Sequence, residues 1–69
     1  MNKIAVIGGR DSVLGFRALG LETCIAENGE QAKAAIHRMA KENYAIIYLT
    51  EYLAAQIPAE IERRREDLS

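Results

Sequence analysis

The chain has 69 residues, of which 49% are hydrophobic and 28% charged, and nine lysines and arginines against ten aspartates and glutamates leave a net charge of −1. This composition is typical of one folded domain and excludes the strong basic field that attracts nucleic acid or anionic lipid, so we expect no nucleic-acid partner. The longest apolar run, residues 45–49, is far shorter than the ~20 residues of a membrane helix, so we expect no membrane insertion.

The first predicted strand covers residues 3–7 and is apolar on both faces from Ile4 onward. Such a strand is typical of the centre of a parallel sheet that helices cover on both sides. Because Lys3 leads directly into this strand, no secretory leader is predicted and we expect a cytoplasmic chain. Gly8 and Gly9 then form a turn.

A short helix is expected after this turn, with Asp11 or Ser12 as its N-terminal cap. Val13 and Phe16 are three residues apart and are the expected core contacts of this helix. Gly15 costs about 1 kcal/mol relative to alanine inside a helix, which predicts close packing at its position.

Gly20 ends that helix, and residues 21–26 form a second strand with Glu22 on its wetter face. Cys24 is expected to be a packed hydrophobic side chain, and His37 a solvated one. The only cysteine and the only histidine of the chain have no partners at metal-ligand spacing, so we predict no disulfide, no zinc site and no cofactor.

An amphipathic helix follows Asn28, which forms a capping box with Gln31 three residues later. Its apolar residues repeat with helical spacing and are Ala32, Ala35, Ile36, Met39 and Ala40. This pattern predicts a helix with one face on the core.

Residues 44–49 form the third predicted strand, again apolar on both faces, and Thr50 caps the helix that follows. Pro58 lacks an amide N–H and crowds the preceding turn, so it either kinks this helix or starts a separate one. Ile57 and Ile61 are expected to pack near this joint.

The alternation of strands and helices predicts a three-layer α/β fold in which residues 1–69 form a single domain. Its small parallel sheet has the strand order 2-1-3 and helices on both faces, as in flavodoxin-like (Rossmann-like) folds. Residues 44–49 would be an apolar edge strand, which predicts that the chain is a fragment or that it self-associates through this edge. Tyr48 shares a strand face with Ile46 and is expected to pack beneath a helix.

Residues at the carboxyl ends of the strands leave two alternative functions open. Gly8 and Gly9 indicate a phosphate- or nucleotide-binding turn, although their spacing matches neither a dinucleotide fingerprint nor a P-loop. A degenerate receiver-like signalling module has the same strand order, with Glu51 in place of the phosphorylated aspartate, but Asp11 lies in the helix cap and not at the strand tip. Neither pattern supplies a catalytic group, so we expect a non-catalytic chain.

Exposed charges at two places are the candidate partner-binding residues. Arg10, Asp11 and Arg17 lie at the first strand-to-helix turn and on its helix, where folds of this class present contact residues. Capping is the alternative role of Asp11, and solvation that of the two arginines. Arg63 and Arg64 lie in a C-terminal segment that acidic neighbours make nearly neutral, which predicts a solvated helix or contact with a charged partner helix.

Three blocks of sequence, which together span nearly the whole chain, form a recognisable combination. They are Ile4-Ala5-Val6-Ile7-Gly8 with Arg10-Asp11-Ser12-Val13-Leu14-Gly15-Phe16-Arg17, then Tyr44-Ala45-Ile46-Ile47-Tyr48-Leu49-Thr50-Glu51, and finally Ile57-Pro58 with Ile61-Glu62-Arg63. Together they resemble the F subunit of V-type and archaeal A-type ATPases, the rotary ion pumps. Gly9 departs from the acidic residue of the family, and we expect the fourth strand and C-terminal helix of the full-length protein to be missing.

This resemblance implies a non-catalytic role in the central stalk, the rotor that transmits torque between the ATP-hydrolysing head and the membrane ring. The F subunit binds the coiled-coil D subunit, alongside the other central-stalk and ring-adaptor subunits, and helps to couple ATP hydrolysis or synthesis to ion transport. The turn from Arg10 to Arg17 and the charged final helix are then the expected docking surfaces, on a chain peripheral to the membrane.

Overall fold

The computed structural model describes residues 3–68 of the chain. Strands and helices alternate as the sequence predicts, and Pro58 starts a separate helix. The elements are β1 (Lys3–Gly8), α1 (Arg10–Ala18), β2 (Glu22–Ile25), α2 (Gly29–Lys41), β3 (Tyr44–Leu49), α3 (Glu51–Ala54) and α4 (Pro58–Leu68). No helix within this described part of the chain is long and apolar enough to cross a membrane.

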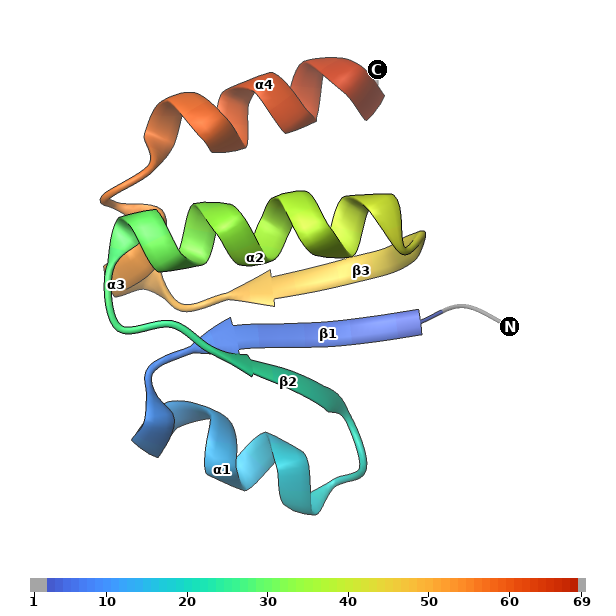
Figure 1. The fold of residues 1–69 in the computed structure, drawn as a ribbon, viewed down its shortest axis with the longest axis vertical. Helices are drawn as coiled ribbons and strands as arrows, with labels where there is room; N and C mark the ends of the chain where they lie inside the picture. Colours follow the sequence, from blue (N-terminus) through green and yellow to red (C-terminus); the bar gives the residue numbers. More distant parts are fainter. Residues whose placement is uncertain (1–2, 69) are drawn as a thin grey trace.

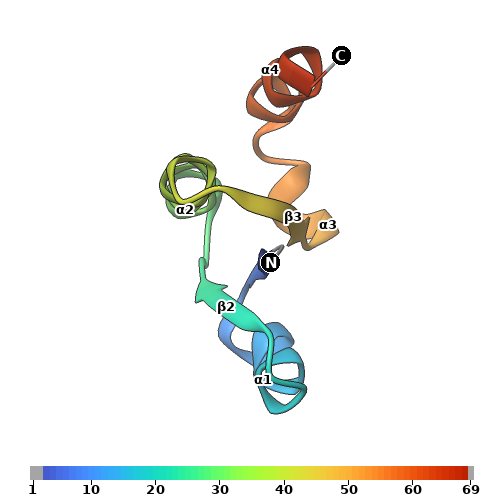
Figure 2. The same cartoon turned by 90° about the vertical axis from the view of Figure 1, so that its right-hand side faces the viewer.

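The strands form one parallel sheet in the order β2-β1-β3 (Figure 1). The chain leaves β1 in one direction to reach β2 and crosses back over β1 to reach β3. Because both crossovers are right-handed, α1 and α2 lie on opposite faces of the sheet (Figure 2). The predicted α/β class, strand order and helices on both faces are therefore confirmed.

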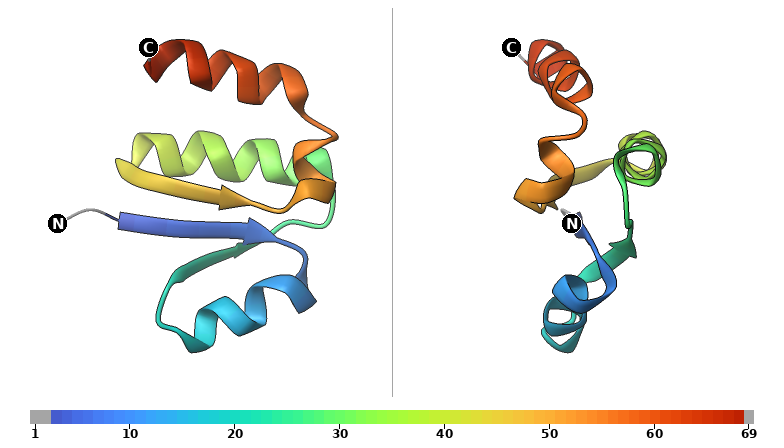
Figure 3. Two further views of the ribbon diagram at one scale, coloured as in Figure 1. Left: turned by 180° about the vertical axis from the view of Figure 1, so that it is seen from behind. Right: turned by 90° about the vertical axis from the view of Figure 1, so that its left-hand side faces the viewer.

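The core is the layer between α2 and one face of the sheet, closed by α3 at the carboxyl ends of the strands (Figure 3). Its buried residues are Ala5, Ile7, Ala26, Ala32, Ala35, Ile36, Met39, Leu53 and Ile57. The predicted apolar face of α2 is confirmed except at Ala40, which is exposed. The predicted packing at the Pro58 joint is also confirmed, because Ile57 is buried and Ile61 packs against the core.

The opposite face of the sheet is only partly covered. Val13 of α1 is fully buried there, as predicted, but Phe16 is 42% exposed. The predictions for Phe16 and for Tyr48, which is 57% exposed, are wrong. The physical reason is that α1 packs mainly against β1 and β2, so the side chains of β3 on this face, Ile46 and Tyr48, remain open to solvent.

The edge strand β3 has β1 on one side, and no strand within residues 3–68 pairs with its other side. α4 lies beyond β3, at the end of the molecule opposite α1 (Figures 1 and 2). Self-association through residues 44–49 stays a prediction.

The start of β3 carries a cation–π contact, in which Lys3 Nζ lies 5.3 Å from the centroid of the Tyr44 ring. Desolvation, and after it the carboxylates of Glu22 and Glu42, raise the pKa of the Tyr44 phenol. The phenol therefore stays protonated at neutral pH.

The predicted N-cap positions of α2 and α3 are confirmed. Asn28 Oδ1 accepts a hydrogen bond from the Gln31 N–H at 2.9 Å. Gln31 Oε1 accepts from the Glu27 N–H at 2.8 Å and not from the amide of Asn28, so the capping box is shifted by one residue. Thr50 is the N-cap residue of α3, although its side chain makes no capping bond.

The prediction of close packing at Gly15 is wrong, because a Cβ built there meets no atom within 4 Å. We expect Gly15→Ala to raise the free energy of unfolding by about 0.5–1 kcal/mol, since alanine restricts the unfolded chain and favours the helix. Urea denaturation with an unchanged m-value measures this gain. Gly20 is the matched control: its surroundings are equally open, but its φ of 84° at the end of α1 makes Gly20→Ala destabilising. A loss of stability in Gly15→Ala would contradict the open position of this residue.

Candidate functional site

The first candidate surface is the turn between β1 and α1. The N-cap residue of α1 is Gly9, and no side chain of the turn itself caps the helix. Asp11 and Ser12 lie inside the first helical turn and are exposed, so the predicted capping role is wrong for both. Instead, Glu27 Oε1 from the loop before α2 accepts a hydrogen bond from the Arg10 N–H at 3.1 Å. A carboxylate at this helix start is favourable because the free amides and the helix dipole are positive there.

The position of Glu27 bears on the nucleotide alternative. A Cβ at Gly9 would lie 3.4 Å from Glu27 Oε2, and a Cβ at Gly8 would lie 2.7 Å from Thr50 Cγ2. A phosphate at this turn would thus meet a like charge and a filled space. Gly8 serves close packing between the loops, and the geometry lends the nucleotide alternative no support.

The receiver alternative requires acidic side chains gathered around a metal ion. Glu51 is the first residue of α3 and is exposed, whereas Asp11 belongs to α1. Within residues 3–68, no three or more His, Cys, Asp or Glu side chains are placed to hold a metal ion together.

Two of the three candidate charged residues of α1 lie on the same face of the helix. Arg10 and Arg17 are seven residues apart, so they lie on the same side of α1, and both are exposed. Arg17 Nε donates a hydrogen bond to Thr23 Oγ1 at 3.2 Å, which places this side over β2. Asp11 is exposed one position further round the helix.

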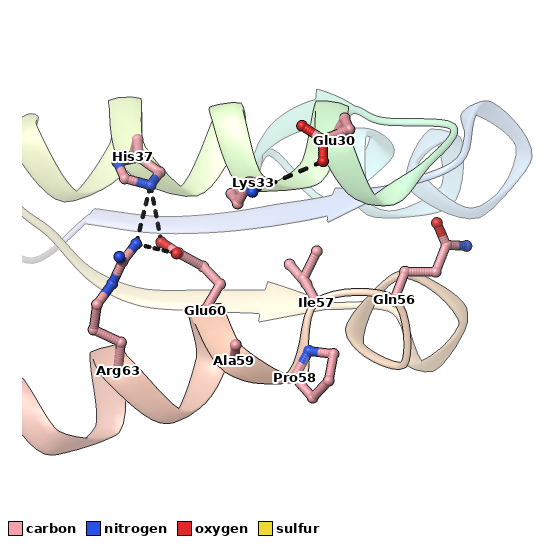
Figure 4. Close-up of a pocket in the computed structure, with 9 residues that line it drawn as sticks. All are labelled: Glu30, Lys33, His37, Gln56, Ile57, Pro58, Ala59, Glu60 and Arg63. Atoms are coloured by element: carbon pink, nitrogen blue, oxygen red, sulfur yellow. Dashed lines mark hydrogen bonds and ion pairs between the residues drawn. The ribbon is translucent and has the colours of Figure 1, made fainter.

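The second candidate surface is α4, where both candidate arginines turn toward one carboxylate. Glu60 is only 5% exposed. Arg63 Nη2 pairs with Glu60 Oε2, and Arg64 Nε lies 3.4 Å from Glu60 Oε1. From α2, His37 Nε2 lies 3.0 Å from Glu60 Oε1 (Figure 4). Glu60 therefore links α4 to α2.

Glu60 and its contact with His37 are the site features that sequence reasoning missed. The spacing of Glu60 to Arg63 and Arg64, three and four residues, is a local signal for ion pairs on one helix. His37 is half-exposed, in keeping with a solvated side chain, but its ring also contacts Glu60. Nothing in the local sequence relates residue 37 to residue 60, because the two helices meet only through the fold.

A groove of about 540 Å³ lies beside this cluster, between α2 and the start of α4 (Figure 4). Lys33 and His37 line it from α2, and Ile57, Glu60 and Arg63 line it from the α4 side. Its charges are already paired in large part, since Lys33 Nζ also lies 3.8 Å from the Glu30 carboxylate.

The two candidate surfaces are not brought together. α1 and α4 lie at opposite ends of the longest dimension of the molecule, 32 Å (Figure 1). The structure thus places Arg10, Asp11 and Arg17 at one end and Arg63 and Arg64 at the other.

Fold and site together define a small parallel α/β domain whose candidate sites are two separate charged surfaces on helices. The chain belongs to the family of the ATP synthase (F/14-kDa) subunit, and the model of this family matches residues 4–69. The resemblance inferred from the sequence blocks is therefore confirmed.

Named relatives come from bacteria and archaea. The chain is 48% identical to the F subunit of the V-type ATP synthase of Fusobacterium nucleatum over 68 residues, which cover 99% of this chain and 65% of the relative. It is 39% identical over 66 residues to the corresponding V-type F subunit of Clostridium botulinum, covering 96% and 64% of the two chains. It is 40% identical over 57 residues to the F subunit of the A-type ATP synthase of Methanocaldococcus jannaschii, covering 80% and 58%. The chain spans less than two thirds of the length of these relatives.

Proposed function

We propose that the chain is a non-catalytic central-stalk subunit of a V/A-type rotary ATPase, bound to the coiled-coil D subunit and peripheral to the membrane on its cytoplasmic side. In this role it helps to couple ATP hydrolysis or synthesis to ion transport. The observation that carries the proposal is the 48% identity with the F subunit of a V-type ATP synthase over 99% of the chain.

The shape of the domain supports contact with a long helix. A span of 32 Å corresponds to about 21 residues of α-helix at ~1.5 Å per residue. One straight helix of a coiled coil is therefore long enough to reach both α1 and α4. A stalk subunit also needs a stiff body, which the covered face of the sheet and its continuous core supply.

Binding of the purified chain to the D subunit tests the proposal directly. We expect a complex in which amide exchange slows in α1 or in α4. The double substitution Arg10→Glu with Arg17→Glu replaces two positive charges on the α1 surface by two negative ones. It should weaken binding about tenfold, equivalent to ~1.4 kcal/mol. Isothermal titration calorimetry measures this change.

Lys41→Glu is the matched control, because Lys41 is an exposed cation at the far end of α2. The affinity of the Lys41→Glu variant for the D subunit should equal that of the wild type. Failure of the wild-type chain to bind the D subunit would refute the partner assignment. Protection confined to α2 would refute the assignment of the α1 and α4 surfaces while leaving the partner in place.

A further inference from the structure

A buried carboxylate and apolar side chains both hold α4 to the rest of the molecule. Glu60 contacts side chains from both helices, namely the His37 ring of α2 and the guanidinium groups of Arg63 and Arg64 of α4. Apolar support comes from Ile57 and Ile61, at the first turn of α4 and just before it. Toward α2, Glu60 Oε1 and Arg63 Nη2 lie 3.0 Å and 3.4 Å from His37 Nε2.

We propose that Glu60 is an internal ligand for Arg63 and Arg64 of its own helix, which keeps both arginines from a carboxylate-rich partner surface, and that the contact of the same carboxylate with His37 keeps α4 on α2. Glu60 and the carboxylates of a partner offer the arginines the same chemistry, because a guanidinium group pairs with any carboxylate of suitable geometry. A partner with several exposed carboxylates therefore competes with Glu60. The proposal adds regulation to the α4 docking surface and rests, in that respect, on the proposed function.

α4 is a helix separate from α3. α4 begins at Pro58, which has no N–H to donate to the preceding turn, so α3 and α4 are not one continuous helix. Residues 55–57 connect the two helices.

Because Glu60 is buried, its carboxylate depends on its ion-pair partners. A carboxylate that is 5% exposed is stable only when it is paired, so taking away its arginines leaves an uncompensated charge between the helices. The isosteric change Glu60→Gln removes this charge and weakens the hold on both arginines. Glu62→Gln is the matched control, because Glu62 lies on the same helix, is exposed, and pairs with the exposed Arg65 at 3.6 Å.

Amide hydrogen exchange of the two variants tests the contact between the helices. We expect the amides of α4 to exchange at least tenfold faster in Glu60→Gln than in the wild type, with β1 and α2 within twofold. Glu62→Gln should match the wild type throughout. An unchanged α4 in Glu60→Gln would overturn the proposal.

A fluorescent octaglutamate peptide at low salt tests the competition. We expect Glu60→Gln to bind it at least fivefold more tightly than the wild type does, and adding Arg63→Gln with Arg64→Gln should abolish this gain. Equal affinities would overturn the proposal even if α4 is loosened.

If amide exchange also becomes faster in β1 and α2 of Glu60→Gln, the variant is generally destabilised, and the test is made on the wild-type chain instead. The peptide should then speed exchange in α4 of the wild type, and no acceleration would overturn the proposal. None of these measurements uses the D subunit, so their failure is distinct from a failure of the proposed function.

Discussion

Leu53→Ala is expected to lower the free energy of unfolding by about 2–5 kcal/mol. Leu53 is fully buried and is one of the largest such side chains. It anchors α3, a helix of four residues that is too short to be stable without tertiary contacts. A domain of this size has a total stability of only about 5 kcal/mol, so the variant should be partly unfolded at 25 °C, as guanidinium denaturation followed by circular dichroism will show.

Tyr52→Ala is the control for this prediction. Tyr52 precedes Leu53 in the same helix but is 69% exposed, so its truncation should change stability by no more than about 0.5 kcal/mol. Equal losses in the two variants would contradict the orientation of α3 against the core.

Gly29→Ala is expected to destabilise the domain by about 1–3 kcal/mol, although alanine is the better helix former. A Cβ at Gly29 would lie 2.9 Å from Gln56 Cβ and 3.2 Å from Ile57 Cγ2. The Gly29 N–H also donates to Gln56 Oε1 at 2.7 Å, so the added methyl group pushes away the segment to which the amide is bonded. Thermal unfolding measures the loss, and faster amide exchange in α4 should accompany it.

A double-mutant cycle with Gln56→Ala isolates the cause. Removing the Gln56 side chain beyond Cβ loses the hydrogen bond in both backgrounds but leaves room for its backbone to shift, so part of the Gly29→Ala cost should disappear in the double variant. Strictly additive costs would mean that the strain lies elsewhere.

Much of the fold follows from local patterns in the chain. The helical repeat from Ala32 to Met39 and the Asn28 cap define α2, because both depend on residues three or four positions apart. The doubly apolar strands and the two crossovers leave few topologies other than the order 2-1-3. Pro58 likewise separates α3 from α4 through its own covalent structure.

The candidate site was predicted less completely. The exposure of Arg10 and Asp11 at the start of α1 and of Arg17 in its last turn agrees with the sequence, but the group that caps this helix is Glu27, from a different loop. Phe16 and Tyr48 look like core residues by their chemistry and are exposed because α1 leaves β3 open.

The amino-acid order was sufficient to identify the family, through the resemblance of its sequence blocks, and to predict the parallel sheet and α2, which follow from periodicity within a few residues. Only the folded molecule shows that Glu60 of α4 meets His37 of α2, and that the two charged surfaces lie at opposite ends. The physical reason is distance along the chain: a buried carboxylate finds partners from whichever helix packs beside it, and the packing of whole elements makes that choice.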